Sequence, residues 1–297
     1  MLTPSRRAVS ASLLSLPLIG ACQSRATPNA IGWMSEMEAI EARRGGRIGV
    51  AARDLATGRT LTHRADERFA MCSTFKWMLG GVVLARVDEG RESLDREIEI
   101  REPDMVFHAP TTKKAVGSRL TVGQLCAATI ANSDNPAANL LLDTMGGPDG
   151  FTQALRDLGD GVTRLDRYEP ELNANTPGDP RDTTTPLAMT DAMERFVFGE
   201  VLSAQSRLTL RDWMLGAVTG DGRLRAGVPD SWALGHKTGT SSRDANNDVG
   251  FALPPTDSGR RPIVIVSFSD GPGALEPAAE GAHADVARAV MAAFGAA

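Results

Sequence analysis

The sequence predicts an α/β fold, an α+β sandwich, in which one antiparallel sheet flanked by helices is built from both chain ends. Alternating apolar and polar residues indicate strands within 47–63 and again within 232–269. Between these regions the apolar residues show helical spacing, and no repeat interrupts them. We therefore expect a sheet domain formed by 31–64 and 217–297, with an all-helical domain at 65–216 inserted into it.

The N-terminal elements are predicted from spacing and turn composition. A helix is expected over 31–43, and its sheet-facing residues at helical spacing are Ile31, Met34, Met37 and Ile40. Strands are expected over 47–53 and 59–63. The turn-forming segment 54–58 separates them, so the two strands should form a hairpin.

The middle of the chain is predicted to be helical. The longest helix should run over 73–89 and end at Gly90, since glycine commonly terminates helices. Thr121 can cap the next helix. Further helices are expected over 135–145, 151–158 and 186–198, with a turn-rich loop over 164–185. The C-terminal region then supplies strands at 232–240, 248–253 and 263–269 and a helix through Val286, Val290 and Phe294.

The composition is that of a soluble-type globular domain, with 42% hydrophobic and 23% charged residues. The formal net charge is -5. Because no basic surface is indicated, nucleic acid is not an expected partner. We expect a monomer that acts on a small molecule.

The first residues resemble a targeting segment. Arg6 and Arg7 precede the uncharged stretch 8–21, which is too short to span a bilayer. We therefore predict a signal peptide at 1–21, a linker at 22–30, and export to the bacterial periplasm.

Two details of this segment leave the export route open. Ser5, Arg6 and Arg7 resemble a twin-arginine signal, although an ordinary secretory signal explains them as well. The residues before Cys22 resemble a lipoprotein cleavage box, which would anchor the protein by a lipid on Cys22. Simple cleavage after Ala21 is the alternative.

Ser73 and Lys76 stand at the start of the long predicted helix. A spacing of three places their side chains on one helix face, about 5–6 Å apart at Cβ. A lysine among apolar neighbours has a lowered pKa and can take the proton of a serine hydroxyl. Alone the pair predicts little, because roughly one such pattern is expected by chance in a chain of this length.

Two further polar motifs follow. The first joins two predicted helices and by itself is typical of helix capping. The second ends a predicted strand, where a cation, hydroxyls and a glycine suit a bound carboxylate, although an edge-strand turn has the same composition. The residues are Ser133, Asp134 and Asn135 in the first motif, and Lys237, Thr238, Gly239 and Thr240 in the second.

The three motifs, in this order, resemble the signature of penicillin-recognising serine enzymes. A fourth, Glu169-Pro170-Glu171-Leu172-Asn173, resembles the class A β-lactamase pattern in which a glutamate and an asparagine hold the deacylating water. The resemblance to class A β-lactamases covers nearly the whole mature chain. It implies a β-lactamase/transpeptidase-like fold, no cofactor, and hydrolysis of penicillin- and cephalosporin-type antibiotics through a serine acyl-enzyme, giving antibiotic resistance.

By this resemblance, Ser73 attacks the β-lactam carbonyl, and the backbone N–H groups of Ser73 and Thr240 form the oxyanion hole. Either Lys76 or Glu169 is the acylation base, and the sequence leaves both open. Glu169, together with Asn173, activates the water that releases the product.

The resemblance also assigns roles around the nucleophile. Ser133 protonates the departing ring nitrogen, with Lys76 and Lys237 setting its environment. Asn135 binds the side-chain amide of the substrate. Three further residues support the loop that carries the glutamate: Arg167 and Asp182 through a salt bridge, and Asn139 by bracing it.

The substrate carboxylate is expected to bind Lys237, Thr238, Gly239 and Thr240. Many relatives add an arginine on the following strand, but here that strand reads Asn246-Asn247-Asp248 and lacks it. Arg223 matches an alternative arginine, although a solvated loop arginine is the competing interpretation. His108 stands at a rim position where relatives place Tyr or Trp, and it could equally be a surface histidine.

The cysteines and histidines imply neither a family disulfide nor a metal. Cys72 and Cys126 match positions that pair in some relatives, but their partner positions hold Ser241 and Gly80. Both cysteines are therefore expected to be buried apolar groups. The histidines at 63, 108, 236 and 283 lack metal-ligand spacing.

Two alternative functions share the serine chemistry. A D,D-peptidase would be inhibited by penicillin, and a penicillin-sensing module would stay acylated. Glu169 with Asn173 argues against the peptidase, because a peptidase gains nothing from a water that clears the drug. A penicillin-sensing module would need a signalling span or a partner domain, and we expect neither from the sequence.

Overall fold

The structure is a computed structural model that describes Met1, residues 28–272 and residues 277–297. The predicted signal peptide beyond Met1 lies outside the described residues, as do the twin-arginine pattern and the lipid-anchor candidate Cys22.

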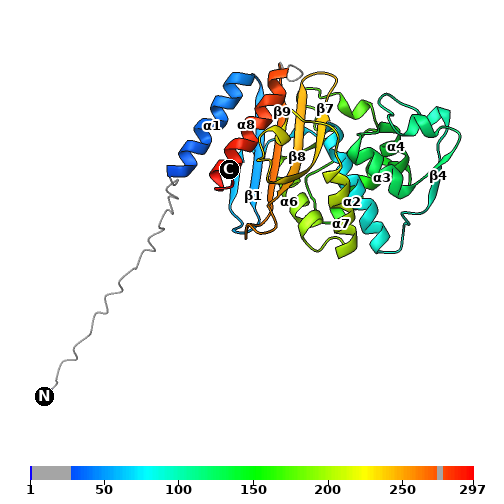
Figure 1. Cartoon of the computed structure of the whole chain (residues 1–297), viewed down its shortest axis with the longest axis horizontal. Helices are drawn as coiled ribbons and strands as arrows, with labels where there is room; N and C mark the ends of the chain where they lie inside the picture. The colour runs from blue at the N-terminus through cyan, green and yellow to red at the C-terminus, as the bar shows by residue number, and fades with distance from the viewer. Residues whose placement is uncertain (2–27, 273–276) are drawn as a thin grey trace.

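One five-stranded antiparallel sheet forms the centre of the fold, as predicted (Figure 1). Its strand order is β2-β1-β9-β8-β7, so the N-terminal hairpin pairs directly with a C-terminal strand. The strands are β1 (Arg47–Asp54), β2 (Thr60–His63), β7 (Ala233–Thr240), β8 (Ala245–Leu253) and β9 (Ile263–Asp270). The pairing explains why both ends of the sequence carry strand patterns.

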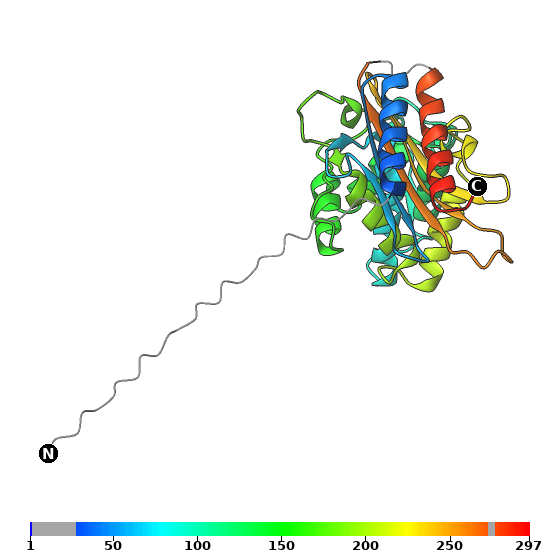
Figure 2. The same ribbon diagram turned by 90° about the vertical axis from the view of Figure 1, so that its left-hand side faces the viewer.

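Two helices cover one face of the sheet: α1 (Pro28–Arg44) and α8 (Pro277–Ala293). Figure 2 shows them running side by side. Trp33, Met37 and Ile40 of α1 are buried against this face, together with Val286 and Val290 of α8. The prediction that Met34 packs there was wrong, because Met34 is 44% exposed. Positions 33, 37 and 40 share one helical face, and a 100° step turns residue 34 away from it.

The other face of the sheet is covered by a layer of helices around α2 (Phe75–Asp88). Apolar residues surround α2 on all sides, and eleven of its residues are buried. The helix α6 (Pro186–Met193) packs directly on β1 and β9 and continues as a π-helical turn, Glu194–Phe198. The remaining helices are α3 (Val122–Ala131), α4 (Asn135–Asp143), α5 (Gly147–Asp157) and α7 (Ala204–Leu215).

The predicted capping and turn signals are largely confirmed. Thr121 accepts from the backbone N–H of Gln124, whose side chain accepts in return from the Thr121 backbone. Gly90 follows the end of α2 with φ of 69°. The strand β8 begins at Ala245, three residues before its predicted start, because pairing with β7 and β9 extends it through polar residues.

Two helices differ from the prediction. The helix α5 begins at Gly147, four residues before its predicted start. The residues 147–150 have a composition typical of a turn, but a proline in the first turn of a helix loses no hydrogen bond, so Pro148 is compatible with the helix. The helix α7 was not predicted at all. Ser203 caps it, and it packs on α2, α3 and β7.

Four short strands form two further pairs. β3 (Phe69–Ala70) pairs with β6 (Thr183–Thr184) and so connects the segment before α2 to the loop 164–185. β4 (Glu97–Glu99) pairs with β5 (Arg119–Thr121) on the other side of α2 in the sequence. Within the described ranges, none of the helices has both the length and the apolar composition needed to cross a membrane.

Candidate active site

Ser73 lies in a short 3-10 turn, Cys72–Thr74, between β3 and α2. Its predecessor Cys72 has φ of 47°, a conformation that costs energy for a residue other than glycine. Gly239 makes the close approach of β7 to this turn feasible, because a Cβ there would lie 2.6 Å from the carbonyl oxygen of Met71. The strand edge therefore fixes the position of the serine.

Lys76 lies one helical turn after Ser73 and has no exposed surface. Its Nζ donates to Ser73 Oγ at 3.0 Å, to the carbonyl oxygen of Ser133 at 2.9 Å and to Asn135 Oδ1 at 2.5 Å. It also lies 2.9 Å from Glu169 Oε1 and 3.3 Å from Ser133 Oγ. The ammonium therefore contacts the turn that holds Ser73, the residues 133 and 135 at the start of α4, and the loop 164–185.

Glu169 reaches the same point from the loop. Its Oε1 accepts from Ser73 Oγ at 3.3 Å, and its Oε2 accepts from Asn173 Nδ2 at 2.5 Å. Asn139 of α4 holds the glutamate backbone from both sides, accepting from its N–H at 3.0 Å and donating to its carbonyl at 2.9 Å. Asn173 Oδ1 is buried and has no hydrogen-bond partner among the described residues.

Lys237 approaches Ser133 from the sheet. Its Nζ donates to Ser133 Oγ at 3.1 Å and to the carbonyl oxygen of Thr238 at 2.8 Å. Burial lowers the pKa of Lys76, and the Glu169 carboxylate only partly opposes this shift. Burial, followed by the positive charge of Lys76, lowers the pKa of Lys237 well below its usual value. Both amines are therefore closer to losing a proton at neutral pH than an exposed lysine is.

Ser73, Ser133 and Asn173 line an open cavity of about 490 Å³. The lining residues that were predicted from the sequence are Ser73, His108, Ser133, Asn135, Asn173, Arg223, Thr238, Gly239 and Thr240. Lys76, Glu169 and Lys237 lie just beneath this lining, through the contacts given above. The predicted nucleophile and its surroundings are thus brought together.

Arg223 is held by more contacts than the sequence indicated. Arg223 is 7% exposed and donates to Thr240 Oγ1 at 3.0 Å and to the carbonyl of Asn247 at 2.8 Å. It also forms a 3.2 Å ion pair with Glu280 of α8. The interpretation of Arg223 as a solvated loop residue is therefore wrong. Neither Glu280 nor Thr219, whose hydroxyl lies 2.7 Å from that of Thr238, was predicted from the sequence.

His108 lies at the rim, exposed, with φ of 64°. Its Nε2 lies 3.0 Å from the carbonyl oxygen of Asn132. The neighbouring Phe107, which the sequence argument missed, is 81% exposed and lines the cavity, and its carbonyl accepts from Asn135 Nδ2 at 2.8 Å. The aromatic surface at this rim is therefore supplied by Phe107 beside the histidine.

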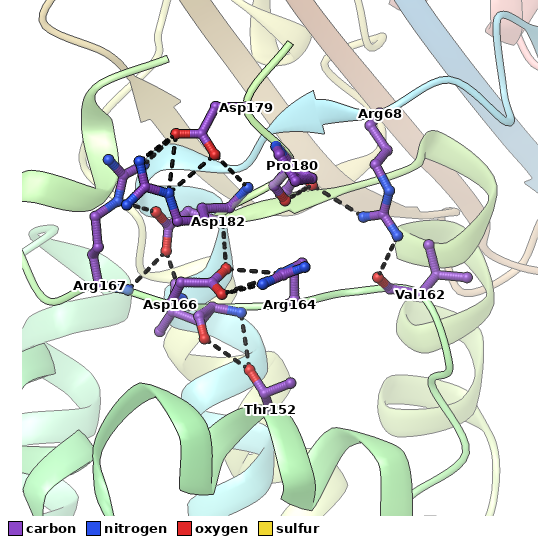
Figure 3. A network of polar contacts seen from close by, with 12 residues as sticks. Arg68, Thr152, Val162, Arg164, Asp166, Arg167, Asp179, Pro180 and Asp182 are labelled. Atoms are coloured by element: carbon purple, nitrogen blue, oxygen red, sulfur yellow. Dashed lines mark hydrogen bonds and ion pairs between the residues drawn. The ribbon is translucent and has the colours of Figure 1, made fainter. Parts of the chain in front are cut away.

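The loop that carries Glu169 is closed by a network of charged residues, shown in Figure 3. Arg167 Nε donates to Asp182 Oδ2 at 2.6 Å, and Asp182 Oδ1 accepts from the backbone N–H groups of Asp166 and Arg167. The carbonyl of Asp182 in turn accepts from the N–H of Met71, just before the nucleophile turn. The loop neck is thereby tied to the segment that presents Ser73.

The two described cysteines are free and buried, as expected. Burial raises the pKa of each thiol. Cys72 packs against Ala70 and Ala245, so it fills space behind the nucleophile.

A serine hydroxyl beside a buried amine and a buried carboxylate can form a covalent acyl intermediate and then transfer it to water. The arrangement is therefore suited to a serine hydrolase, with Ser73 lying between a sheet edge and a helical layer.

Comparison with known proteins agrees with this class. Residues 33–294 match the sequence model of the β-lactamase enzyme family. The chain is 44% identical over 263 residues to Beta-lactamase L2 of Stenotrophomonas maltophilia, covering 87% of this chain and 86% of that protein.

Solved structures give the same result. An ancestral (GNCA) class A β-lactamase, from the last common ancestor of Gram-negative bacteria, superimposes with a TM-score of 0.86 at 49% identity, covering 88% of this chain and 100% of that chain. A β-lactamase from Xanthomonas campestris pv. campestris gives a TM-score of 0.86 at 42% identity, covering 90% and 99%. The chain belongs to the β-lactamase enzyme family, and within it to class A.

Proposed function

We propose that this enzyme hydrolyses the amide bond of penicillin- and cephalosporin-type antibiotics through an acyl-enzyme on Ser73, and that it thereby gives resistance. The observation that carries the proposal is that Ser73 Oγ lies 3.0 Å from Lys76 Nζ and 3.3 Å from Glu169 Oε1. Lys76 positions the Ser73 hydroxyl for attack, and Glu169 is a carboxylate able to activate water. A hydrolase needs both, whereas a penicillin-sensing protein needs only the first.

In acylation, the Ser73 oxygen bonds to the β-lactam carbonyl carbon while its proton passes to a neighbouring base. Lys76 and Glu169 are both within reach of that proton. The resulting oxyanion would accept from the backbone N–H groups of Ser73 and Thr240. Such a donor is worth about 10²–10³ in rate.

Opening of the ring requires a proton on the departing nitrogen. Ser133 is suited to supply it because its hydroxyl lies 3.1 Å from Lys237 Nζ and 3.3 Å from Lys76 Nζ. The lowered pKa of each lysine favours passing a proton on to the serine as the serine gives up its own.

Deacylation would use Glu169 and Asn173. The Glu169 carboxylate and the partnerless Oδ1 of Asn173 are both acceptors, so one water can donate to each and point its oxygen toward the acyl carbon. Glu169 removes a proton from this water as the water oxygen bonds to the acyl carbon. The ester bond to Ser73 then breaks, and Ser73 Oγ takes up a proton from Glu169 or Lys76, which both lie within reach.

The substrate carboxylate would bind between Lys237, Thr238, Gly239 and Thr240, with Arg223 behind Thr240 as the second cation. Asn135 still has one N–H free of its contact with Phe107, and this N–H would donate to the substrate's side-chain amide. Phe107 and His108 form the rim, and Arg167, Asp182 and Asn139 hold the loop that carries Glu169.

We further propose that residues 1–21 direct export to the periplasm, by the secretory or the twin-arginine route, and that the mature chain is a monomer, free or lipid-anchored at Cys22. The parts 31–64 with 217–297, and 65–216, would form its two domains, with the site between them.

Turnover of a chromogenic cephalosporin tests the proposed function. We expect many product molecules per enzyme at a constant rate. A single stoichiometric burst followed by a stable adduct would instead support a D,D-peptidase or a penicillin-sensing module.

A further inference from the structure

A buried histidine–aspartate pair lies behind the substrate-carboxylate side of the site. His236 of β7 and Asp248 of β8 have no exposed side-chain surface, and His236 Nδ1 lies 2.8 Å from Asp248 Oδ1. Neither residue lines the cavity, and the proposed chemistry uses neither. A buried charge is costly unless its partners repay the desolvation, so the pair calls for a physical reason.

The contacts of His236 define its protonation. Arg225 Nη2 lies 2.9 Å from His236 Nε2, and an arginine nitrogen can only donate. Nε2 must therefore accept, so the neutral ring carries its hydrogen on Nδ1 and donates to Asp248. Burial raises the pKa of Asp248, but His236 and the positive charge of Arg223 outweigh burial and hold that pKa below its usual value.

Both members of the pair bind the segment that carries Arg223. Asp248 Oδ2 accepts from the backbone N–H of Leu224 at 3.1 Å, and His236 accepts from the side chain of Arg225. The two residues that follow Arg223 are thus attached to β7 and β8. The Leu224 side chain is fully buried in the core beneath α8, so the segment has three separate attachments.

The preceding loop residues pack on the same pair. Gly220 has φ of 80°, and a Cβ there would lie 2.5 Å from Thr238 Cγ2 and 3.3 Å from His236 Cε1. This close packing brings Thr219 Oγ1 to within 2.7 Å of Thr238 Oγ1. The loop that leads to Arg223 is therefore packed against His236 as well as against Thr238.

We propose that His236 and Asp248 are positioning residues that hold Arg223 against Thr240 for recognition of the substrate carboxylate. This inference rests on the role proposed above for Arg223. A guanidinium that is misplaced by about 1 Å loses much of its effect on a bound anion. Loss of the pair should therefore weaken binding of the substrate carboxylate while leaving the reaction at Ser73 intact.

Steady-state kinetics with a carboxylate-bearing penicillin test this inference. We expect His236→Ala and His236→Asn each to raise KM by about tenfold with kcat changed by less than about twofold. Asparagine is included because it can still donate to Asp248 from the position of Nδ1, which preserves the buried hydrogen bond that the fold needs. It cannot reach Arg225, so the contact with that residue is lost. His63→Asn, at a buried histidine of β2, is the control and should leave both constants unchanged.

A double-mutant cycle separates positioning from general loosening of the fold. In an Arg223→Ala background, His236→Ala should cause no further increase in KM, because the group it positions is already gone. The inference is overturned if the double variant raises KM by the product of the two single effects. It is also overturned if Arg223→Ala raises KM but neither His236 variant does. If Arg223→Ala itself leaves KM unchanged, the role proposed for Arg223 fails, and the inference fails with it.

Nitrogen-15 chemical shifts of the imidazole ring give a readout that does not depend on activity. At neutral pH we expect His236 to show a protonated Nδ1 and an unprotonated Nε2. A protonated Nε2 would overturn the arrangement, since it could not accept from Arg225.

Discussion

Lys76 Nζ lies 2.9 Å from Glu169 Oε1, and neither side chain is exposed. The two charges come from different parts of the chain and partly repay one another's desolvation. Both also contact Ser73 Oγ, so the ion pair and this hydroxyl form one hydrogen-bonded unit. Removal of either charge is therefore expected to leave the other one buried without its partner and to change the hydrogen bonds of Ser73 Oγ.

Glu169→Ala should block deacylation while leaving acylation measurable. Loss of a general base is expected to slow release of the acyl group by about 10²–10⁴-fold. Mass spectrometry after mixing with penicillin should then show the enzyme heavier by one drug molecule. Glu171→Gln, two residues away and exposed, is the matched control and should clear the drug normally. An adduct in Glu169→Ala that decays as fast as in the native enzyme would refute the role of Glu169.

Arg223→Ala should raise KM for carboxylate-bearing substrates, because it removes a cation that lies 3.0 Å from Thr240 Oγ1. An increase of about tenfold, equivalent to about 1.4 kcal/mol, is expected for loss of one charged contact. The comparison is Arg243→Ala, an exposed arginine near the same edge of the sheet, which should behave as wild type. Equal KM values for the two variants would remove Arg223 from the site.

Asp182→Ala should destabilise the fold and slow deacylation. The substitution leaves the Arg167 guanidinium and two backbone N–H groups without their acceptor. We expect the free energy of unfolding, measured in urea, to fall by on the order of 2–3 kcal/mol. Arg181→Ala breaks only an exposed pair with Asp179 and should cause no measurable change. Equal stability of Asp182→Ala and wild type would show that the loop is held by other contacts.

His283→Asn should flatten part of the pH dependence of stability. Burial, followed by the positive charge of Arg223, lowers the pKa of His283 to about 3, so the folded protein keeps this ring neutral. Below about pH 6.5 the unfolded chain takes up a proton that the folded chain does not, so the wild type loses stability as the pH falls toward 3. This contribution is at most about 1.4 kcal/mol per pH unit.

Urea unfolding of both proteins between pH 7 and pH 4 provides the measurement. Carboxylates affect the two proteins alike, so the stability of His283→Asn relative to wild type should increase steadily on acidification. Parallel curves would contradict a neutral, buried His283.

Much of the fold was predictable because its signals are local. β1 and β9 are buried along most of their length, and this burial is reflected in short apolar runs of the sequence. Thr121 and Gly90 mark helix ends by their own chemistry. The helix α7 was missed because few of its residues are buried: Ser206, Leu210 and Met214 are buried, whereas Leu208 is 50% exposed. Its contacts with α2 and β7, rather than a strong periodic pattern, stabilise it.

The candidate site divides in the same way. Ser73 and Lys76 share a helix face through a spacing that the chain itself imposes, and Glu169 and Asn173 lie in one short motif. Glu280 carries no such signal. It lies 57 residues from its partner Arg223, and only the packing of α8 brings the two together.

The sequence by itself therefore determined most of the strands and helices along the chain, the family, and the residue types available to the site. Tertiary structure alone decided how readily Lys76 and Lys237 lose a proton, because burial lowers the pKa of each, and it lowers the pKa of the buried His283 in the same way. It also decided which distant groups meet, such as His236 with Arg225 and Asp248. The physical reason is that hydrophobic periodicity is written along the chain, whereas desolvation and Coulomb interactions depend on distances that exist only after the sheet and helices have packed.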